Sequence, residues 1–377
     1  MKKNLVNIEI KTTNICNLEC VYCYQPEFQE REWLTESVVD KIIEYVRDLG
    51  MSGQRRFHFL WHGGEPTLHK VEFYKYIVKR QKEILGNTEY INFIQTNGVN
   101  LHLDLLEFMK SENFIVGISI DGPELLHDKY RKDRGGRGTY DRVVNTIKDL
   151  KMRNIPVLAN CVLRKSSLED LEELYNFFKS LDLFVTFNIL LPPTGNILAP
   201  TASTMEHEYL NSEDYGKAIV YFLDRWLNDK EYMAAIDTYN YIIWSLIRNT
   251  QFGCFKAECP QYHRAFSPSG KMYVCGRFYG WPDNNLRIGY LSWDDNKSQI
   301  SESYPDLLCS NCPIVELCHG GCAFDRYAMS GSFLKKEPYC VSYLIIYEYF
   351  EKHKIEIESK MRLLQDNNPH FNKIYYE

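Results

Sequence analysis

The chain has 377 residues, 45% of them hydrophobic, which is enough to bury a large core and favours more than one domain. Its formal net charge of −6 excludes the strongly basic surface of a nucleic-acid binder, and no apolar run approaches the roughly 18 residues that a membrane helix needs. Glu9 and Lys11 interrupt the first apolar stretch, which therefore predicts a strand and not a secretion signal. Twelve cysteines in such a chain favour thiolate ligands over disulfides, and we expect a reducing, cytoplasmic location.

Up to about residue 191, short apolar runs alternate with stretches of helical periodicity. Behind Thr35, a residue suited to an N-cap, apolar residues recur at helical spacing until Gly50. Six such repeats predict an α/β fold with a parallel sheet, and six suit a partial (β/α)6 barrel of the TIM type better than a complete one. The predicted strands are 5–11, 57–61, 90–94, 115–120, 157–163 and 184–191, and the later predicted helices are 71–85, 103–111, 140–152 and 168–180.

The remaining chain changes character. Helical periodicity continues at 212–228 and 234–249, and then eight of the twelve cysteines fall between Cys254 and Cys340. That segment has too little periodic apolar sequence to build its own core, so we expect it to need metal to fold. The predicted organisation is a barrel core at 1–230, a helical connection at 231–250, a cysteine-rich domain at 251–345, and a C-terminal helix (from about 342 to 364) and tail in 346–377.

Three cysteines, Cys16, Cys20 and Cys23, crowd into eight residues directly after the first predicted strand. Three thiols leave one sulfur over if they pair as disulfides, but they can hold an iron–sulfur cluster from three corners and leave the fourth iron open. Polar and glycine-rich segments also follow other predicted strands, such as Gly63-Gly64-Glu65-Pro66. Because the C-terminal ends of parallel strands meet at one edge of a sheet, we expect these segments to share a site.

The eight later cysteines divide evenly into two four-thiolate sites. Four cysteines suit tetrahedral zinc as well as a cubane, so both metals are open from this segment alone. The N-terminal trio favours iron–sulfur clusters over zinc for these eight cysteines, because a chain that receives one iron–sulfur cluster can receive others. The twelfth cysteine, Cys161, lies inside the fifth predicted strand and is expected to be a small buried hydrophobe. The eight are Cys254, Cys259, Cys275, Cys309, Cys312, Cys318, Cys322 and Cys340.

In these motifs the chain resembles the radical S-adenosylmethionine (SAM) enzymes. Cys16-x3-Cys20-x2-Cys23-Tyr24 matches their signature, and Gly63-Gly64-Glu65-Pro66 matches their second motif. The late cysteines resemble the SPASM auxiliary-cluster domain: an opening cysteine, Gly270-x4-Cys275, Cys309-x2-Cys312-x5-Cys318-x3-Cys322 and a distant Cys340.

The resemblance implies three 4Fe–4S clusters and SAM as cofactors, with one cluster on the trio and two auxiliary clusters. SAM cleavage at the open iron would release a 5′-deoxyadenosyl radical that takes a hydrogen atom from the substrate, while the protein supplies position and a dry cavity. A flavodoxin or ferredoxin would supply the electron. The implied SAM contacts are Tyr22, Gly63, Gly64, Glu65, Pro66, Ser119, Arg131 and Leu190. Without the family, Arg131 reads equally well as a solvated charge at a helix start.

The resemblance also divides the late cysteines between the auxiliary clusters. One set would be Cys254, Cys259, Cys275 and Cys322, and the other Cys309, Cys312, Cys318 and Cys340. Fully thiolate-ligated clusters leave no iron open, so these clusters would pass electrons and not bind substrate.

The nearest resemblance within the family is to the anaerobic sulfatase maturases, which oxidise a cysteine or serine to formylglycine. It rests on Gln95-Thr96-Asn97-Gly98 and on Ser119 to Pro123, followed by His127 and Arg131. Those enzymes carry an aspartate base where this chain has Gly276, and a missing base costs about 10²–10⁴ in rate. The favoured interpretation is therefore a maturase that crosslinks side chains of a ribosomally made peptide through a C–C or thioether bond. Sulfatase maturation is the alternative, and a zinc-stabilised binding module is the alternative from another class.

Overall fold

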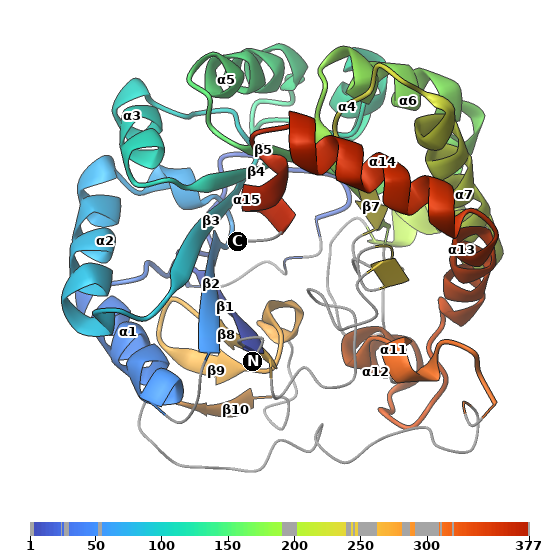
Figure 1. Ribbon diagram of the computed structural model, residues 1–377. Coiled ribbons are helices and arrows are strands. Elements are labelled where there is room, and N and C mark those ends of the chain that lie inside the picture. Colours follow the sequence, from blue (N-terminus) through green and yellow to red (C-terminus); the bar gives the residue numbers. More distant parts are fainter. Residues whose placement is uncertain are drawn as a thin grey trace. The chain divides into compact units, whose positions relative to one another are not determined.

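The computed structural model describes residues 4–23, 25, 30–51, 55–190, 202–238, 243, 246–247, 262–280, 287–290, 309, 311–318 and 320–375 (Figure 1). The chain folds into two compact units, and each unit draws on separate stretches of sequence. The first unit comprises Met1–Ile118, Arg131–Val157 and Glu258–Ser301. The second comprises Ser119–Tyr130, Leu158–Ala257 and Glu302–Glu377.

The first unit is built on a mainly parallel sheet with the strand order β10-β9-β8-β1-β2-β3-β4. The four strands β1 to β4 run parallel, β8 runs parallel to β1, and β9 and β10 are antiparallel additions. The carboxyl ends of β1 to β4 therefore meet at one edge. The strands are β1 (Asn4–Lys11), β2 (Arg55–His62), β3 (Tyr90–Thr96), β4 (Ile115–Ser119), β8 (His263–Phe266), β9 (Lys271–Tyr273) and β10 (Arg287–Tyr290).

Helices cover one face of this sheet. Figure 1 shows α1 (Glu36–Met51), α2 (Val71–Leu85) and α3 (Leu103–Ser111) along the outside of β1 to β3, and α5 (Tyr140–Met152) belongs to the same unit. Strand β2 alternates, as a strand with two different faces must, and its Phe57, Phe59 and Trp61 are buried. The opposite face of β1 and β2 is consequently available for polar side chains.

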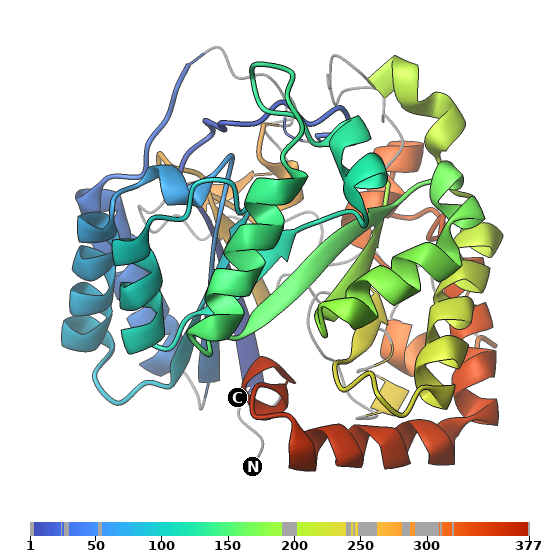
Figure 2. The ribbon, with the colours of Figure 1, turned by 90° about the horizontal axis from the view of Figure 1, so that it is seen from above.

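The second unit carries the parallel strands β5-β6-β7 in that order. Its C-terminal helices pack against α7 as the views of Figures 1 and 2 agree. At the α7–α13 contact a Cβ on Gly216 would lie 2.8 Å from the Cα of Ser342, so only glycine permits this approach. The elements are α4 (Glu124–Tyr130), β5 (Val157–Leu163), α6 (Leu171–Ser180), β6 (Phe184–Ile189), α7 (Ser212–Asn228), β7 (Ile236–Thr238), α11 (Val315–Cys318), α12 (Ala323–Ser330), α13 (Cys340–Lys352), α14 (Lys354–Asn367) and α15 (Phe371–Tyr375).

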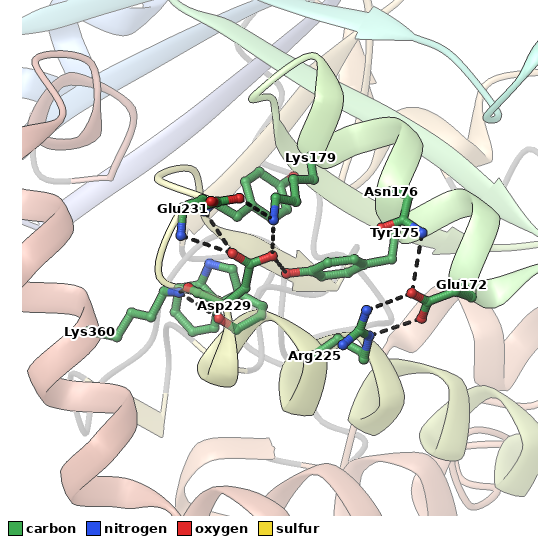
Figure 3. Close-up of polar contacts among 10 residues, drawn as sticks. Glu172, Tyr175, Asn176, Lys179, Arg225, Asp229, Glu231 and Lys360 are labelled. Atoms are coloured by element: carbon green, nitrogen blue, oxygen red, sulfur yellow. Dashed lines mark hydrogen bonds and ion pairs between the residues drawn. The ribbon is translucent and has the colours of Figure 1, made fainter.

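A polar network joins α6, α7 and α14 in the second unit (Figure 3). Asp229, which ends α7, accepts a hydrogen bond from Tyr175 at 3.0 Å and pairs with Lys179 at 2.8 Å. Lys360 is buried and donates to the backbone carbonyls of Trp226, at 2.5 Å, and Asp229. Burial lowers the pKa of Lys360 to about 8, although Asp229 opposes that shift. These contacts are structural and fix the C-terminal helices.

The predicted α/β class is confirmed, with six strand–helix repeats in the predicted order. Two details were wrong. Part of the helix expected at 234–249 is strand β7, because residues 236–238 continue the sheet beside β6. The single helix expected at 342–364 is two helices that meet at His353. Among the described helices, none has both the length and the apolar character that crossing a membrane requires.

Candidate functional site

The three N-terminal cysteines lie together on the loop that leaves β1. Cys23 donates its backbone N–H to the carbonyl of Cys20 at 3.1 Å, and the thiol of Cys16 accepts from the N–H of Leu18 at 3.4 Å. Burial, together with the charges of Glu65, Cys20 and Cys23, raises the pKa of Cys16 to about 12. The three sulfurs are thus within electrostatic reach of one another, and none of the three forms a disulfide.

The donor set of this loop is three cysteine thiols. In the described residues, no three His, Cys, Asp or Glu side chains are arranged to hold one metal ion. A cubane takes each thiolate on a different iron, so three thiolates on one short loop are a donor set that such a cluster accepts.

The segment after β2 lies against the cysteine loop because it lacks side chains. A Cβ on Gly63 would lie 2.3 Å from the carbonyl oxygen of Thr13, and one on Gly64 would lie 2.1 Å from that of Ile15. The N–H of Gly64 donates to Thr13 at 2.7 Å, and that of Glu65 donates to Ile15 at 2.9 Å. Since the N–H of Gly64 is used, its carbonyl is the group that could accept from a ligand amine.

Glu65 is a positioning residue in this geometry. Its side chain is buried and accepts from the hydroxyl of Thr96 at 2.6 Å and the N–H of Asn97 at 2.8 Å. It also caps the short 3₁₀ helix that begins at Pro66. Asn97 in turn donates to the side chain of Asn17 at 2.7 Å. The end of β3 is thereby tied to both the Gly-Gly segment and the cysteine loop.

Arg131 begins a second loop that contacts the cysteine loop. Its guanidinium lies over the ring of Tyr22, 5.3 Å from the ring centroid, and the residue is buried, which excludes the interpretation as a solvated charge. Arg134 donates to the carbonyl oxygen of Cys16 at 2.9 Å, and the N–H of Glu19 donates to Lys132 at 2.9 Å. The supporting role of Arg134 could not be found from the sequence, because only the fold brings it to Cys16.

Ser119 and Leu190 belong to the second unit. Ser119 is the last residue of β4, and Leu190 follows β6, where it is buried and donates its N–H to Leu163 at 3.0 Å. Beside Ser119, the buried carboxylate of Asp121 pairs with Arg164 at 3.2 Å. Ser119 and Leu190 thus lie at the carboxyl ends of β4 and β6.

Four of the late cysteines line one cavity. Cys309, Cys312, Cys318 and Cys340 surround it together with Glu337. Burial raises the pKa of Cys318, and the charges of Glu337 and the other three thiols raise it further. This is the set that the resemblance assigns to one auxiliary cluster, and four thiols around one space fit such a group. Of the other set, Cys322 is buried at the start of α12 and Cys275 lies after β9, while Cys254 and Cys259 lie outside the described residues. Cys161 is buried in β5, as predicted.

The loop after Cys275 is shaped by Glu9 of β1. The N–H of Gly276 donates to Oε2 of Glu9 at 3.1 Å, and a Cβ on Gly276 would lie only 2.0 Å from Oε1. Glu9 also pairs with Lys11 at 2.8 Å and with Nε2 of His263 at 3.3 Å. An aspartate at 276 has no room here. Gly276 was evident from the sequence, whereas the pairing of Glu9 with His263 was missed because 254 positions separate them.

Comparisons with known proteins agree with this architecture. Residues 10–178 match the family model of the radical SAM superfamily. The cysteine-type anaerobic sulfatase-maturating enzyme of Clostridium novyi is 27% identical over 356 residues, which cover 88% of this chain and 91% of that protein. The serine-type enzyme of Bacteroides thetaiotaomicron is 26% identical over 364 residues, covering 89% and 86%.

Solved structures share the fold. The structure of native anSMEcpe with bound AdoMet superposes with a TM-score of 0.76 at 23% identity, covering 94% of this chain and 99% of that one. Streptococcus suis SuiB bound to its precursor peptide SuiA superposes with a TM-score of 0.65 at 15% identity, covering 90% and 76%. At these identities the likeness concerns the fold.

Proposed function

We propose that this chain, whose residues 10–178 match the radical SAM superfamily model, is a radical SAM maturase that oxidises side chains of a peptide or protein. The observation that supports the proposal is the loop of Cys16, Cys20 and Cys23, whose first residues Thr13 and Ile15 accept backbone hydrogen bonds from Gly64 and Glu65. Relatives of similar length that match along most of this chain are named as protein maturases.

The residues of the first unit would hold the cofactors as follows. The trio would ligate a 4Fe–4S cluster, the carbonyl of Gly64 would accept from the amine of SAM, and Tyr22 and Arg131 would contact SAM, with Glu65 and Pro66 fixing the segment. Ser119 and Leu190, which the resemblance also implies as SAM contacts, lie in the second unit. When bound, the cluster and SAM supply a 5′-deoxyadenosyl radical that removes a hydrogen atom from the substrate.

The late cysteines would hold two auxiliary clusters, for a total of three. Cys309, Cys312, Cys318 and Cys340 fit one of them because they already line a common cavity. The resemblance assigns the other to Cys254, Cys259, Cys275 and Cys322, of which Cys275 lies in the first unit and Cys322 in the second. An electron donor of the flavodoxin or ferredoxin type and a reducing, cytoplasmic setting suit a chain whose described cysteines are free thiols.

Crosslinking of a peptide is the first candidate for the bond formed. Its support is Gly276, because the space of an aspartate side chain at this position is taken by Glu9. Formylglycine formation is the second candidate, and the names of the relatives support it. Both reactions remove the same equivalents from the substrate: one hydrogen atom, one electron and one proton.

The test is anaerobic reconstitution followed by iron, sulfide and zinc analysis and an assay of SAM cleavage. We expect about twelve irons per chain, from three cubanes, and 5′-deoxyadenosine formation that is lost in Cys16→Ala. Zinc with negligible iron would refute the enzymatic proposal in favour of a binding module. A cysteine-containing sulfatase peptide then distinguishes the candidates by mass, since formylglycine production from it would exclude crosslinking as the sole activity.

A further inference from the structure

A carboxylate and an imidazole meet on the polar face of the first unit's sheet. Strands β1 and β8 pair in parallel with Asn7 opposite His263 and Glu9 opposite Ala265, so Glu9 and His263 are diagonal neighbours on one face. Their side chains approach to 3.3 Å between Oε2 and Nε2, and both are largely buried. Two strands distant in sequence thus present one polar pair.

Glu9 is held in its ionised form. Burial by itself raises the pKa of this carboxyl, but Lys11 and His263 outweigh burial and leave the pKa well below its ordinary value. Lys11 lies at 2.8 Å from Oε1, and the N–H of Gly276 donates to Oε2. An anionic carboxylate at 3.3 Å can only accept, so Nε2 of His263 is the nitrogen that carries the hydrogen.

The second ring nitrogen of His263 is Nδ1. In a neutral imidazole with hydrogen on Nε2, Nδ1 carries the lone pair. This atom is buried and has no hydrogen-bond partner among the described residues. Buried polar atoms are usually paired, so the unpaired Nδ1 is unusual. A carboxylate that binds one nitrogen of an imidazole orients the other nitrogen as a proton acceptor.

The pair is also well placed. Lys11, the neighbour of Glu9, lies 3.5 Å from Nδ1 of His62, the residue before Gly63. Lys11 is close enough to Cys23 to oppose, with Arg131, the effect of burial on the pKa of that thiol. On its other side, Glu9 touches Gly276. Polar contacts therefore lead from His62, next to Gly63, through Lys11 and Glu9 to the loop after Cys275.

We propose that His263 accepts the substrate proton in the radical oxidation, through Nδ1, and that Glu9 is its positioning partner. The inference rests on the proposed function. After a substrate C–H bond has lost its hydrogen atom to the radical that the bound cofactors would supply, an oxidised iron–sulfur cluster would accept one electron. His263 would take the proton of the thiol or hydroxyl whose heteroatom bonds to that carbon or, in a C–C crosslink, the proton of the carbon that is joined to it. The balance is the same for a crosslink and for an oxidised side chain, and it needs no carboxylate at position 276.

The activity test uses reconstituted holoenzyme, SAM, a reductant and the cysteine-containing sulfatase peptide. For His263→Phe we expect 5′-deoxyadenosine formation within about twofold of wild type and a product yield lower by about 10²–10⁴, partly restored by added imidazole. His353→Gln, which alters a histidine stacked on Tyr349 in the second unit, should leave both readouts unchanged. Equal product yields for wild type and His263→Phe overturn the proposal.

A second readout does not depend on turnover. Nitrogen-15 NMR of histidine-labelled holoenzyme reports which ring nitrogen carries hydrogen. We expect the Nε2–H form for His263 in wild type and its loss in Glu9→Leu, which removes the acceptor; an Nδ1–H form in wild type overturns the proposal. If wild type cleaves SAM but leaves the peptide unmodified, this peptide is not a substrate of the protein. The NMR measurement of which nitrogen of His263 carries hydrogen then decides whether the Glu9–His263 pair exists.

Discussion

Replacing Gly276 by alanine tests the contact that distinguishes the loop after Cys275. The new Cβ would lie 2.0 Å from Oε1 and 2.3 Å from Cδ of Glu9, so the carboxylate and the loop cannot both keep their places. If Glu9 turns away, it loses the N–H of Gly276 at 3.1 Å and the ammonium of Lys11 at 2.8 Å. The Lys11 side chain is 1% exposed and would remain as a buried charge without that carboxylate.

The expected cost follows from these contacts. Breaking a buried ion pair by removing one partner costs about 3–5 kcal/mol. We therefore expect Gly276→Ala to lower the free energy of unfolding by about 3–5 kcal/mol. Gly50→Ala is the matched control, because its Cβ would meet the nearest atom at 3.5 Å inside α1, and alanine gains up to about 1 kcal/mol of helix propensity there.

Urea unfolding under anaerobic conditions measures these differences for the single variants and for Glu9→Ala/Gly276→Ala. In the double variant the carboxylate that meets the new Cβ is gone, so the two substitutions should be less than additive by about 1–3 kcal/mol. Additive effects, or a Gly276→Ala protein as stable as Gly50→Ala, would show that Glu9 does not fill this space.

Two further predictions concern other parts of the chain. Gly64→Ala puts a Cβ 2.1 Å from the carbonyl oxygen of Ile15 and should displace the cysteine loop, so we expect loss of the SAM-cleaving cluster, measured as about four fewer irons per chain; full iron content would contradict this. Lys360→Met tests the network of Figure 3: because the pKa of Lys360 falls from 10.5 to about 8 on folding, the unfolded chain binds more protons between these values, and wild-type stability should rise with pH relative to the variant. The difference in unfolding free energy should change by up to about 3 kcal/mol between pH 8 and pH 10.5, and a constant difference would refute the shift.

Much of the fold could be predicted from periodicity. Helices such as 71–85 and 140–152 match the structure to the residue, because each has a long apolar stripe and clear ends. The short strand at 236–238 was missed, since three residues carry no measurable period and their pairing with β6 is decided by the tertiary fold. Likewise, the break at His353 falls within a continuous helical pattern and becomes evident only when α13 packs on α7.

In the candidate site, too, some residues could be predicted from the sequence and others only from the tertiary fold. Cysteines at a characteristic spacing can be recognised in a sequence, so Cys16, Cys20 and Cys23 were predicted as ligands from the sequence. Asn97 and Arg134 support that loop through single hydrogen bonds, which only the fold establishes. In the sequence, Glu9 is no more than an interruption of an apolar run. Its role depends on His263 and Gly276, which pair or pack beside β1 from the far end of the sequence.

Gly276 consequently has a different meaning in the structure than in the sequence. Read alone, it is a missing carboxylate after Cys275, and it argues against any reaction that needs a base there. In the fold, a carboxylate does lie beside that backbone, supplied by β1 and joined to an imidazole whose Nδ1 has no partner among the described residues. The glycine is the residue that makes room for it. Substrate choice in this protein should therefore be sought in what reaches His263, and not in the loop residue that follows Cys275.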